Sequence, residues 1–348
     1  MHPSVDPLDA PAHLQARLTT WQAFSARLAG ADDRQLSSLF EASAKRASFG
    51  GRSALLEIDG AKVWGKGIAL TDLERLPHNR HCTANLFKLP LFYQYGVGSA
   101  GFGAWRELAA NLAATAWVVG DECASFPLLY HWRVLPAPRR PPPGADELAR
   151  TERYITGWNG SPAVRARWQA NFEATANLVL FLEYVPQTAY AWVTAQAGEG
   201  AEAAAAAFAM LDDELTAAAR FLNARGMQHF DLHSENVLTD GRQLYIADFG
   251  LANSSAFELS AAERAFFDRH QDYDRAYVAG ALARLYEAVR PPTSASLDAR
   301  IERHRPLASI QNEFLRALRE DNSKQTPFPA EAVAQALAES KFERVEIS

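Results

Sequence analysis

One stretch constrains the fold of this chain more than any other: HFDLHSENVLTDGRQLYIADFGLA, residues 229–252. It begins with His229-x-Asp231, continues to Asn236, and closes with Asp-Phe-Gly at residues 248–250. Between these polar clusters, NVLTD and QLYIAD predict two short strands joined as a hairpin. The alternative interpretation is that these residues are acidic turns in an ordinary helical protein. It would have to explain both polar clusters, their order and the hairpin between them. We therefore interpret the stretch as a functional site.

This order of residues resembles the catalytic loop and the metal-binding motif of the protein kinases and their relatives. The resemblance implies an α+β, two-lobed protein-kinase-like fold, with a small β-rich N-lobe and a larger helical C-lobe. It also implies ATP and Mg²⁺ as cofactors, and transfer of the γ-phosphoryl group to a hydroxyl. In that role Asp231 would orient the attacking hydroxyl and take its proton, while Asn236 and Asp248 would bind magnesium. Gly250 would let the chain turn sharply after the metal ligand.

The resemblance is divided between two branches of this superfamily. Where most protein kinases have a lysine, between Asp231 and Asn236, this chain has His233, which is usual in aminoglycoside and choline phosphotransferases. Phe249-Gly250 is the protein-kinase form, but the segment that follows is short and no Ala-Pro-Glu succeeds it. We count His233 with the catalytic residues. The acceptor is expected to be a protein serine/threonine, the reading that we favour, or a small-molecule hydroxyl.

A lysine that contacts the nucleotide phosphates is expected on a strand before the catalytic loop. Lys66 lies in the apolar segment VWGK and fits this position, so we assign it both a catalytic and a nucleotide-binding role. Lys62 and Lys88 are its competitors. We interpret Lys62 as a solvated charge at a strand edge, and Lys88 has no glycine turn at hairpin distance before it.

Two glycine-rich stretches compete for the role of covering the phosphates. YGVGSAGFGAW, residues 95–105, has the spacing Gly-x-Gly-x-x-Gly, but the chain has no lysine in the range 89–323. No strand after this stretch can therefore bring a lysine to the phosphates. SFGGRS, residues 48–53, lies one hairpin before the candidate lysine. We expect its Gly50 and Gly51 to bind the nucleotide.

The family pairs the lysine with a glutamate on a helix. Glu107, in the helical pattern GAWRELAANLA, is the best candidate, although it lies further from Lys66 than is usual. Glu74 is the rival, but it follows the lysine too closely to leave room for a loop and a helical turn. A solvated helix glutamate remains the alternative interpretation of Glu107.

The segment LFLEYV is predicted to be the hinge between the two lobes. The backbone of Glu183 and Val185 would meet the edge of the adenine ring, and Leu182 would close the back of the pocket. A core strand that runs into a loop is compatible with the same sequence. Further along, HQDYDRAYVAGALARLYE resembles the buried helix that anchors the catalytic loop, with Asp274, or alternatively Asp272, bracing the loop backbone.

These patterns divide the chain into three parts. Residues 1–47 form an N-terminal helical extension, residues 48–185 an N-lobe with insertions, and residues 186–348 a helical C-lobe that contains the catalytic loop. The excursions at residues 70–100 and 136–175 have no counterpart in the resemblance. The second of them begins with the proline-rich PAPRRPPPGADE, which predicts a surface segment.

The composition is that of a soluble globular protein, with 48% apolar and 22% charged residues in 348. A net charge of −6 argues against a broad nucleic-acid or anionic-membrane surface. The two cysteines, Cys82 and Cys123, have no metal-binding or redox spacing. No apolar run approaches the length of a membrane span, and we expect a cytoplasmic protein. A pseudokinase scaffold is a further alternative, although Lys66, Asp231 and both metal ligands are all retained.

Overall fold

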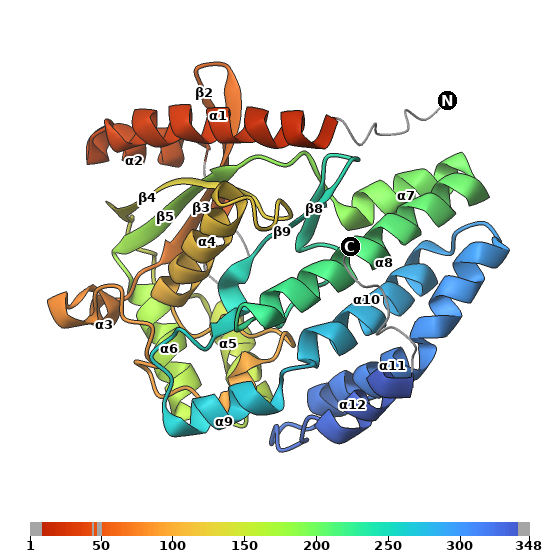
Figure 1. The fold of residues 1–348 in the computed structure, drawn as a ribbon. Coiled ribbons are helices and arrows are strands. Elements are labelled where there is room, and N and C mark those ends of the chain that lie inside the picture. The colour runs from red at the N-terminus through yellow and green to blue at the C-terminus, as the bar shows by residue number, and fades with distance from the viewer. Residues whose placement is uncertain (1–8, 44, 47–50, 340–348) are drawn as a thin grey trace.

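The structure, a computed structural model, describes residues 9–43, 45–46 and 51–339. Within these residues, a five-stranded antiparallel sheet is followed along the chain by a mainly helical region (Figure 1). This arrangement confirms the α+β class that was expected from the sequence. Among the described residues, no helix combines the length and the apolar character needed to cross a membrane.

The sheet has the strand order β1-β2-β3-β5-β4. Its strands are β1 (Lys45–Arg46), β2 (Arg52–Ile58), β3 (Ala61–Ala69), β4 (Leu129–Pro136) and β5 (Ala176–Glu183). Strands β2 and β3 form a hairpin through Asp59 and Gly60, which both have positive φ, as a tight hairpin turn requires. The register places Lys66 opposite Ser53 on β2 and opposite Leu180 on β5. The candidate lysine therefore lies in the middle of the sheet.

Strand β5 is buried on both faces because helices cover the sheet on each side. Helices α1 (Asp9–Ala29) and α2 (Asp33–Ser43) lie on one face, where Val179 and Phe181 join the main core (Figure 1). Helix α4 (Ala104–Val119) lies on the other face and packs against Leu178 and Leu180. Burial of each such side chain contributes about 1.5–3 kcal/mol. The sheet is thereby fixed between the N-terminal helices and α4.

The helical region contains the loop and hairpin of residues 229–252. Its helices are α7 (Ala189–Glu199), α8 (Ala201–Ala224), α9 (Ala261–Arg269), α10 (Tyr273–Val289), α11 (Ala295–Glu320) and α12 (Ala330–Glu339). Its short strands are β6 (Gln187–Thr188), β7 (Met227–Gln228), β8 (Val237–Thr239), β9 (Leu244–Ile246) and β10 (Asn253–Ser254). Strands β8 and β9 pair in antiparallel register, as predicted for NVLTD and QLYIAD.

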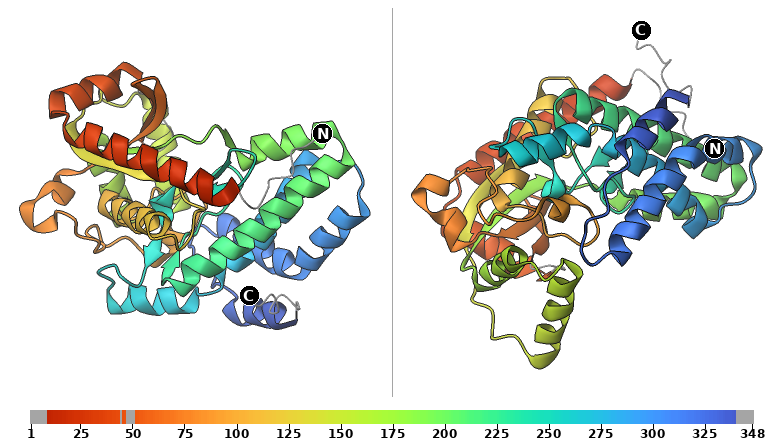
Figure 2. Two further views of the ribbon diagram at one scale, coloured as in Figure 1. Left: turned by 45° about the horizontal axis from the view of Figure 1, so that its top comes forward. Right: turned by 90° about the horizontal axis from the view of Figure 1, so that it is seen from below.

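The two excursions without a counterpart pack against each other. Residues 70–100 contain α3 (Asp72–Arg75) and short 3-10 turns, and residues 136–175 contain α5 (Ala145–Gly157) and α6 (Pro162–Glu173). Ile155 and Trp158, near the end of α5, form a separate apolar cluster with Leu89 and Tyr93. In the right-hand view of Figure 2, α5 and α6 project from the body of the molecule. The excursions together form one structural unit.

Candidate functional site

A pocket of about 890 Å³ lies between the sheet and the helical region. It collects residues that are far apart in the sequence. The residues expected from the sequence that line it are Gly51, Lys66, Glu107, Leu182, Glu183, Val185, Asp231, His233, Asn236 and Asp248. Gly50, like residues 48 and 49 of the same turn, lies outside the described residues.

Lys66 binds two carboxylates at once. Its Nζ lies 2.6 Å from Oε1 of Glu107 and 2.8 Å from Oδ1 of Asp248. Burial alone would lower the pKa of Lys66, but Asp248 and Glu107 raise it above its usual range. The ammonium group is therefore retained, and it joins strand β3, helix α4 and the segment that follows β9 in one ionic network.

The two carboxylates in this network differ in their environment. The Glu107 side chain is only 7% exposed, and burial raises its pKa despite the neighbouring Lys66. The Asp248 side chain is 47% exposed, and although burial opposes ionisation, Lys66 lowers the pKa of Asp248 to about 2. Asp248 is thus the carboxylate that stays ionised and remains accessible from the pocket.

Helix α4 is held by buried ion pairs near its N-terminus. Arg106 pairs with Glu263 of α9 at 2.6 Å, and both side chains are almost fully buried. The rival glutamate, Glu74, does not contact Lys66; it pairs with Arg167 of α6 at 2.8 Å and accepts the N–H of Ala104 at the start of α4. Glu74 therefore helps to position the helix that carries Glu107.

Asp231 is surrounded by polar groups from its own loop and from helix α10. Nδ2 of Asn236 donates to Oδ2 of Asp231 at 3.0 Å, and the hydroxyl of Tyr277 donates to Oδ1 at 3.1 Å. Nε2 of His233 lies 3.6 Å from Oδ2. Burial opposes protonation of His233, but Asp231 raises its pKa above the usual value. These contacts fix the orientation of the Asp231 carboxylate in the pocket.

The backbone that carries Asp231 is braced by helix α10. Asp274 accepts the N–H of His229 at 2.6 Å and that of Phe230 at 2.8 Å, as the sequence led us to expect. The alternative residue, Asp272, forms an ion pair with Arg275 instead. The brace holds Phe230 in a left-handed conformation with φ +67°.

The two candidate metal ligands are brought together by the hairpin. The backbone N–H of Ala247 donates to the carbonyl of Asn236 at 3.0 Å, so Asp248 follows directly beside Asn236. Asp248 has φ +61°, and its Oδ1 accepts the N–H of Gly250 as well as a bond from Lys66. Carboxylate and amide oxygens suit a hard cation such as Mg²⁺. The side-chain oxygens of Asn236 and Asp248 therefore fit the Mg²⁺ ion that the sequence implies.

The glycine-rich stretch at residues 95–105 lies at the Asp231 end of the pocket. A Cβ at Gly96 would overlap Oδ1 of Asp231, and one at Gly101, where φ is +73°, would overlap the carbonyl of Gly250. Both glycines are therefore required by close approach to the loop that carries Asp231 and to the Asp-Phe-Gly turn. Gly51 lies with Lys66 on the sheet side of the same pocket.

The segment LFLEYV lines the pocket as strand β5 ends. The backbone N–H of Glu183 donates to the carbonyl of Leu128 at 2.8 Å. This N–H is therefore already used in a hydrogen bond within the protein. We therefore expect the carbonyl of Glu183, and not its N–H, to face a ligand. Sequence reasoning missed two residues that position this site, Arg17 beside Glu183 and Tyr277 beside Asp231, because neither belongs to a local pattern.

No protein-family model matches the chain, and no curated protein sequence matches it. The function of the site has to be inferred from its own side chains. What they offer is a half-buried lysine between two carboxylates and a third, oriented carboxylate in the same pocket.

Proposed function

We propose that this protein is an ATP- and Mg²⁺-dependent phosphotransferase with a two-lobed, protein-kinase-like fold, which transfers the γ-phosphoryl group to a hydroxyl. The ion pairs of Lys66 with Glu107 and Asp248, in one pocket with Asp231, carry the proposal. Phosphoryl transfer depends mainly on positioning and on charge stabilisation, which such a set of groups supplies.

Lys66 would bind the nucleotide phosphates. Glu107 orients the ammonium group from α4, and because its carboxylate is buried, this contact is shielded from water. The carbonyl of Glu183 and the backbone of Val185 would meet the base at the other end of the pocket. Asn236 and Asp248 would hold Mg²⁺, which neutralises phosphate charge when it is bound.

Asp231 would act as the base that orients the acceptor hydroxyl and takes its proton. Asn236 and Tyr277 hold its carboxylate in place from opposite oxygens. A general base in this position contributes roughly 10²–10⁴ in rate. A scaffold without turnover would need none of these contacts, so we regard a pseudokinase role as the weaker alternative.

The acceptor side of the pocket favours a small-molecule hydroxyl over a protein. Beyond Asp231 the pocket is walled by Gly98 and Ser99 of the glycine-rich stretch and by Arg167 and Asn171 of α6. Both α6 side chains are polar, so this wall of the pocket can form hydrogen bonds with a small polar acceptor.

The segment after Gly250 supports the same preference. Residues 251–254 and Phe257 are buried, and β10 pairs with β7, so little of this segment is free to dock a substrate chain. The Asp-Phe-Gly sequence still favours a protein serine/threonine acceptor. We therefore keep that acceptor as the second candidate.

Purified protein with Mg²⁺ and ATP, offered a peptide library and a panel of aminoglycosides and nucleoside antibiotics, tests both levels of the proposal. We expect ADP formation that depends on a small hydroxyl compound. Phosphorylation confined to peptides would reverse the order of the two acceptors. Absence of Mg²⁺-dependent ATP binding, measured by calorimetry, would contradict the phosphotransferase itself.

A further inference from the structure

Helix α1 is fastened to the sheet along strand β4. Nε1 of Trp21 donates to the carbonyl of Leu129 at 3.0 Å, and the ring of Phe24 stacks on Tyr130 with centroids 5.4 Å apart. These contacts fix the C-terminal half of α1 on the sheet. The helix belongs to the N-terminal extension, for which the sequence suggested no role.

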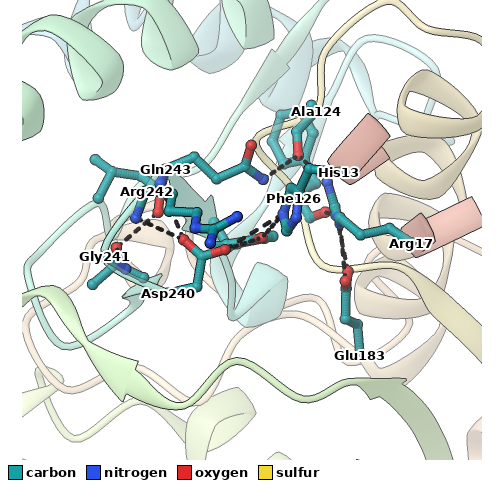
Figure 3. Close-up of polar contacts among 12 residues, drawn as sticks. His13, Arg17, Ala124, Phe126, Glu183, Asp240, Gly241, Arg242 and Gln243 are labelled. Carbon is teal, nitrogen blue, oxygen red and sulfur yellow. Dashed lines mark hydrogen bonds and ion pairs between the residues drawn. The ribbon is translucent and has the colours of Figure 1, made fainter. Parts of the chain in front are cut away.

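The other end of α1 reaches the β8–β9 hairpin. Nε2 of His13 lies 3.1 Å from the hydroxyl of Tyr245 and 3.4 Å from Oδ2 of Asp240 (Figure 3). This hairpin lies between the catalytic loop and Asp248. Helix α1 therefore spans the junction between the sheet and the helical region, as Figure 1 also shows.

Arg17 lies at the middle of this span and is almost fully buried. Nε and Nη2 of Arg17 donate to both carboxylate oxygens of Glu183, at 2.9 and 2.8 Å. Nη1 donates to the carbonyl of Ala124 at 2.8 Å, and Nη2 also donates to that of Phe126 at 2.7 Å (Figure 3). A planar guanidinium fixes the direction of a carboxylate in such a two-point contact.

Glu183 transmits this contact to the pocket. Its Oε2 accepts the N–H of Leu128 at 3.0 Å, and its own N–H donates to the carbonyl of Leu128. The side chain of Glu183 is only 12% exposed, so it is held on all sides while its backbone lines the pocket. The direction of the Glu183 carbonyl is thereby coupled to Arg17.

We propose that Arg17 is a positioning residue for nucleotide binding: by holding Glu183 it sets the backbone edge that receives the base. The inference rests on the proposed function, because it takes the ligand to be an adenine nucleotide. It also gives the N-terminal helix a role in the site. A buried arginine that only stabilised the fold would leave the affinity of the folded protein for adenosine unchanged.

Adenosine is the probe that isolates this contact, because it carries the base without the phosphates. In the full chain, Arg17→Met should weaken the binding of adenosine and the binding of ATP by the same factor, about tenfold, because the backbone edge that receives the base is misplaced. The turnover number at saturating ATP should stay within about threefold of wild type, because the transferring groups are untouched. Calorimetry and steady-state kinetics measure the two effects.

Two variants serve as matched controls. Lys66→Met should weaken ATP but leave adenosine binding unchanged, because Lys66 is assigned to the phosphates. Arg27→Met alters an arginine of the same helix whose side chain is 62% exposed and pairs with Asp59 at the surface, and it should change neither affinity.

A folded Arg17→Met protein that binds adenosine as tightly as wild type overturns the role of Arg17. Equal losses of turnover number and affinity, together with a lowered melting temperature, overturn it as well. If Arg17→Met does not fold, Glu183→Gln decides: it keeps the shape of the side chain, and it should weaken adenosine by about threefold, as loss of a charged hydrogen bond partner implies. An unchanged affinity in that variant rejects the inference.

The failure of the proposed function gives a different result. A wild-type protein that binds neither adenosine nor ATP contradicts the phosphotransferase. A wild-type protein that binds both, beside an Arg17→Met protein with unchanged adenosine affinity, contradicts only the role of Arg17.

Discussion

Phe230 and Asp248 occupy a backbone region that side chains other than glycine rarely adopt, with φ of +67° and +61°. Each such conformation costs on the order of 1–3 kcal/mol and persists only where the surroundings enforce it. Asp274 enforces the first by accepting the N–H of Phe230, and Lys66 and Gly250 hold the side chain at the second. Phe230 directly precedes Asp231, the proposed base. Asp248 itself supplies the carboxylate that we assign to the metal.

Asp248→Ala should remove the effect of Mg²⁺ on ATP affinity. The substitution deletes the charged ligand that we assign to the metal, and the remaining donor of the pair, Asn236, is neutral. Calorimetric titrations with ATP, with and without Mg²⁺, measure the effect. Asp213→Ala, at an exposed position of α8, is the control. A magnesium effect of wild-type size in Asp248→Ala would rule out the metal role.

His233 predicts a pH dependence of ATP affinity. Its pKa is raised above the usual value of about 6.5 because the attraction of Asp231 outweighs burial. The charged form, and its stabilising contact with Asp231, is therefore fully present below that pH and is lost as the pH rises through the higher pKa. ATP should therefore bind less tightly at a pH above the raised pKa of His233. His233→Gln should bind ATP with an affinity that does not change as the pH rises through this pKa. A change of wild-type size in this variant would show that His233 is not the group responsible.

The residues that the sequence proposes for the site are those whose chemistry requires a fixed type at a fixed spacing. Asp231, Asn236 and Asp248 are recognisable because one loop and one hairpin carry all of them. Arg17 could not be recognised, because its partner Glu183 lies 166 positions away and helix α1 has the periodicity of any amphipathic helix. Tyr277, 46 positions from Asp231, is hidden in the same way.

At the scale of elements, the hairpins were predictable and the excursions were not. The Asp-Gly turn between β2 and β3 is a local signal, and the structure has it. The helices α5 and α6 were missed because the sequence before them is proline-rich and because their burial depends on distant partners. Trp158, for example, packs against Tyr93. Contacts between residues so far apart cannot be recognised from a short stretch of sequence.

The role of the glycine-rich stretch at residues 95–105 also depends on distant partners, and its placement gives a prediction. Its spacing alone does not tell a phosphate-covering loop from a close approach to Asp231. Gly96→Ala should lower the turnover number by about tenfold or more, because its Cβ would displace the Asp231 carboxylate. Gly98→Ala should lower the free energy of unfolding by about 1 kcal/mol, from backbone strain at φ +104°, with little effect on turnover.

Steady-state kinetics and urea denaturation of the two variants separate these effects. Gly98 is the matched control because it lies in the same stretch and its Cβ would meet no atom within 4 Å. A larger loss of turnover in Gly98→Ala than in Gly96→Ala would contradict the placement of this stretch against the loop that carries Asp231.

At the scale of the whole molecule, the proposed site exists only where the sheet and the helical region meet. Lys66 comes from the sheet, Glu107 from α4, and Asp231 and Asp248 from the loop and hairpin of the helical region. The α+β class was expected from the resemblance of residues 229–252, and the sheet followed by helices agrees with it. The junction itself depends on long-range contacts, such as the buried pair of Arg106 and Glu263, that no pattern in the sequence predicts.

The most direct test of the proposed function compares the wild-type protein with Asp231→Asn. The asparagine keeps the shape of the side chain and removes only the carboxylate that we propose as the base. We predict that Asp231→Asn binds ATP with Mg²⁺ within about twofold of the wild-type affinity and transfers the phosphoryl group about a hundredfold or more slowly. Transfer by Asp231→Asn at the wild-type rate would contradict the assignment of the catalytic loop.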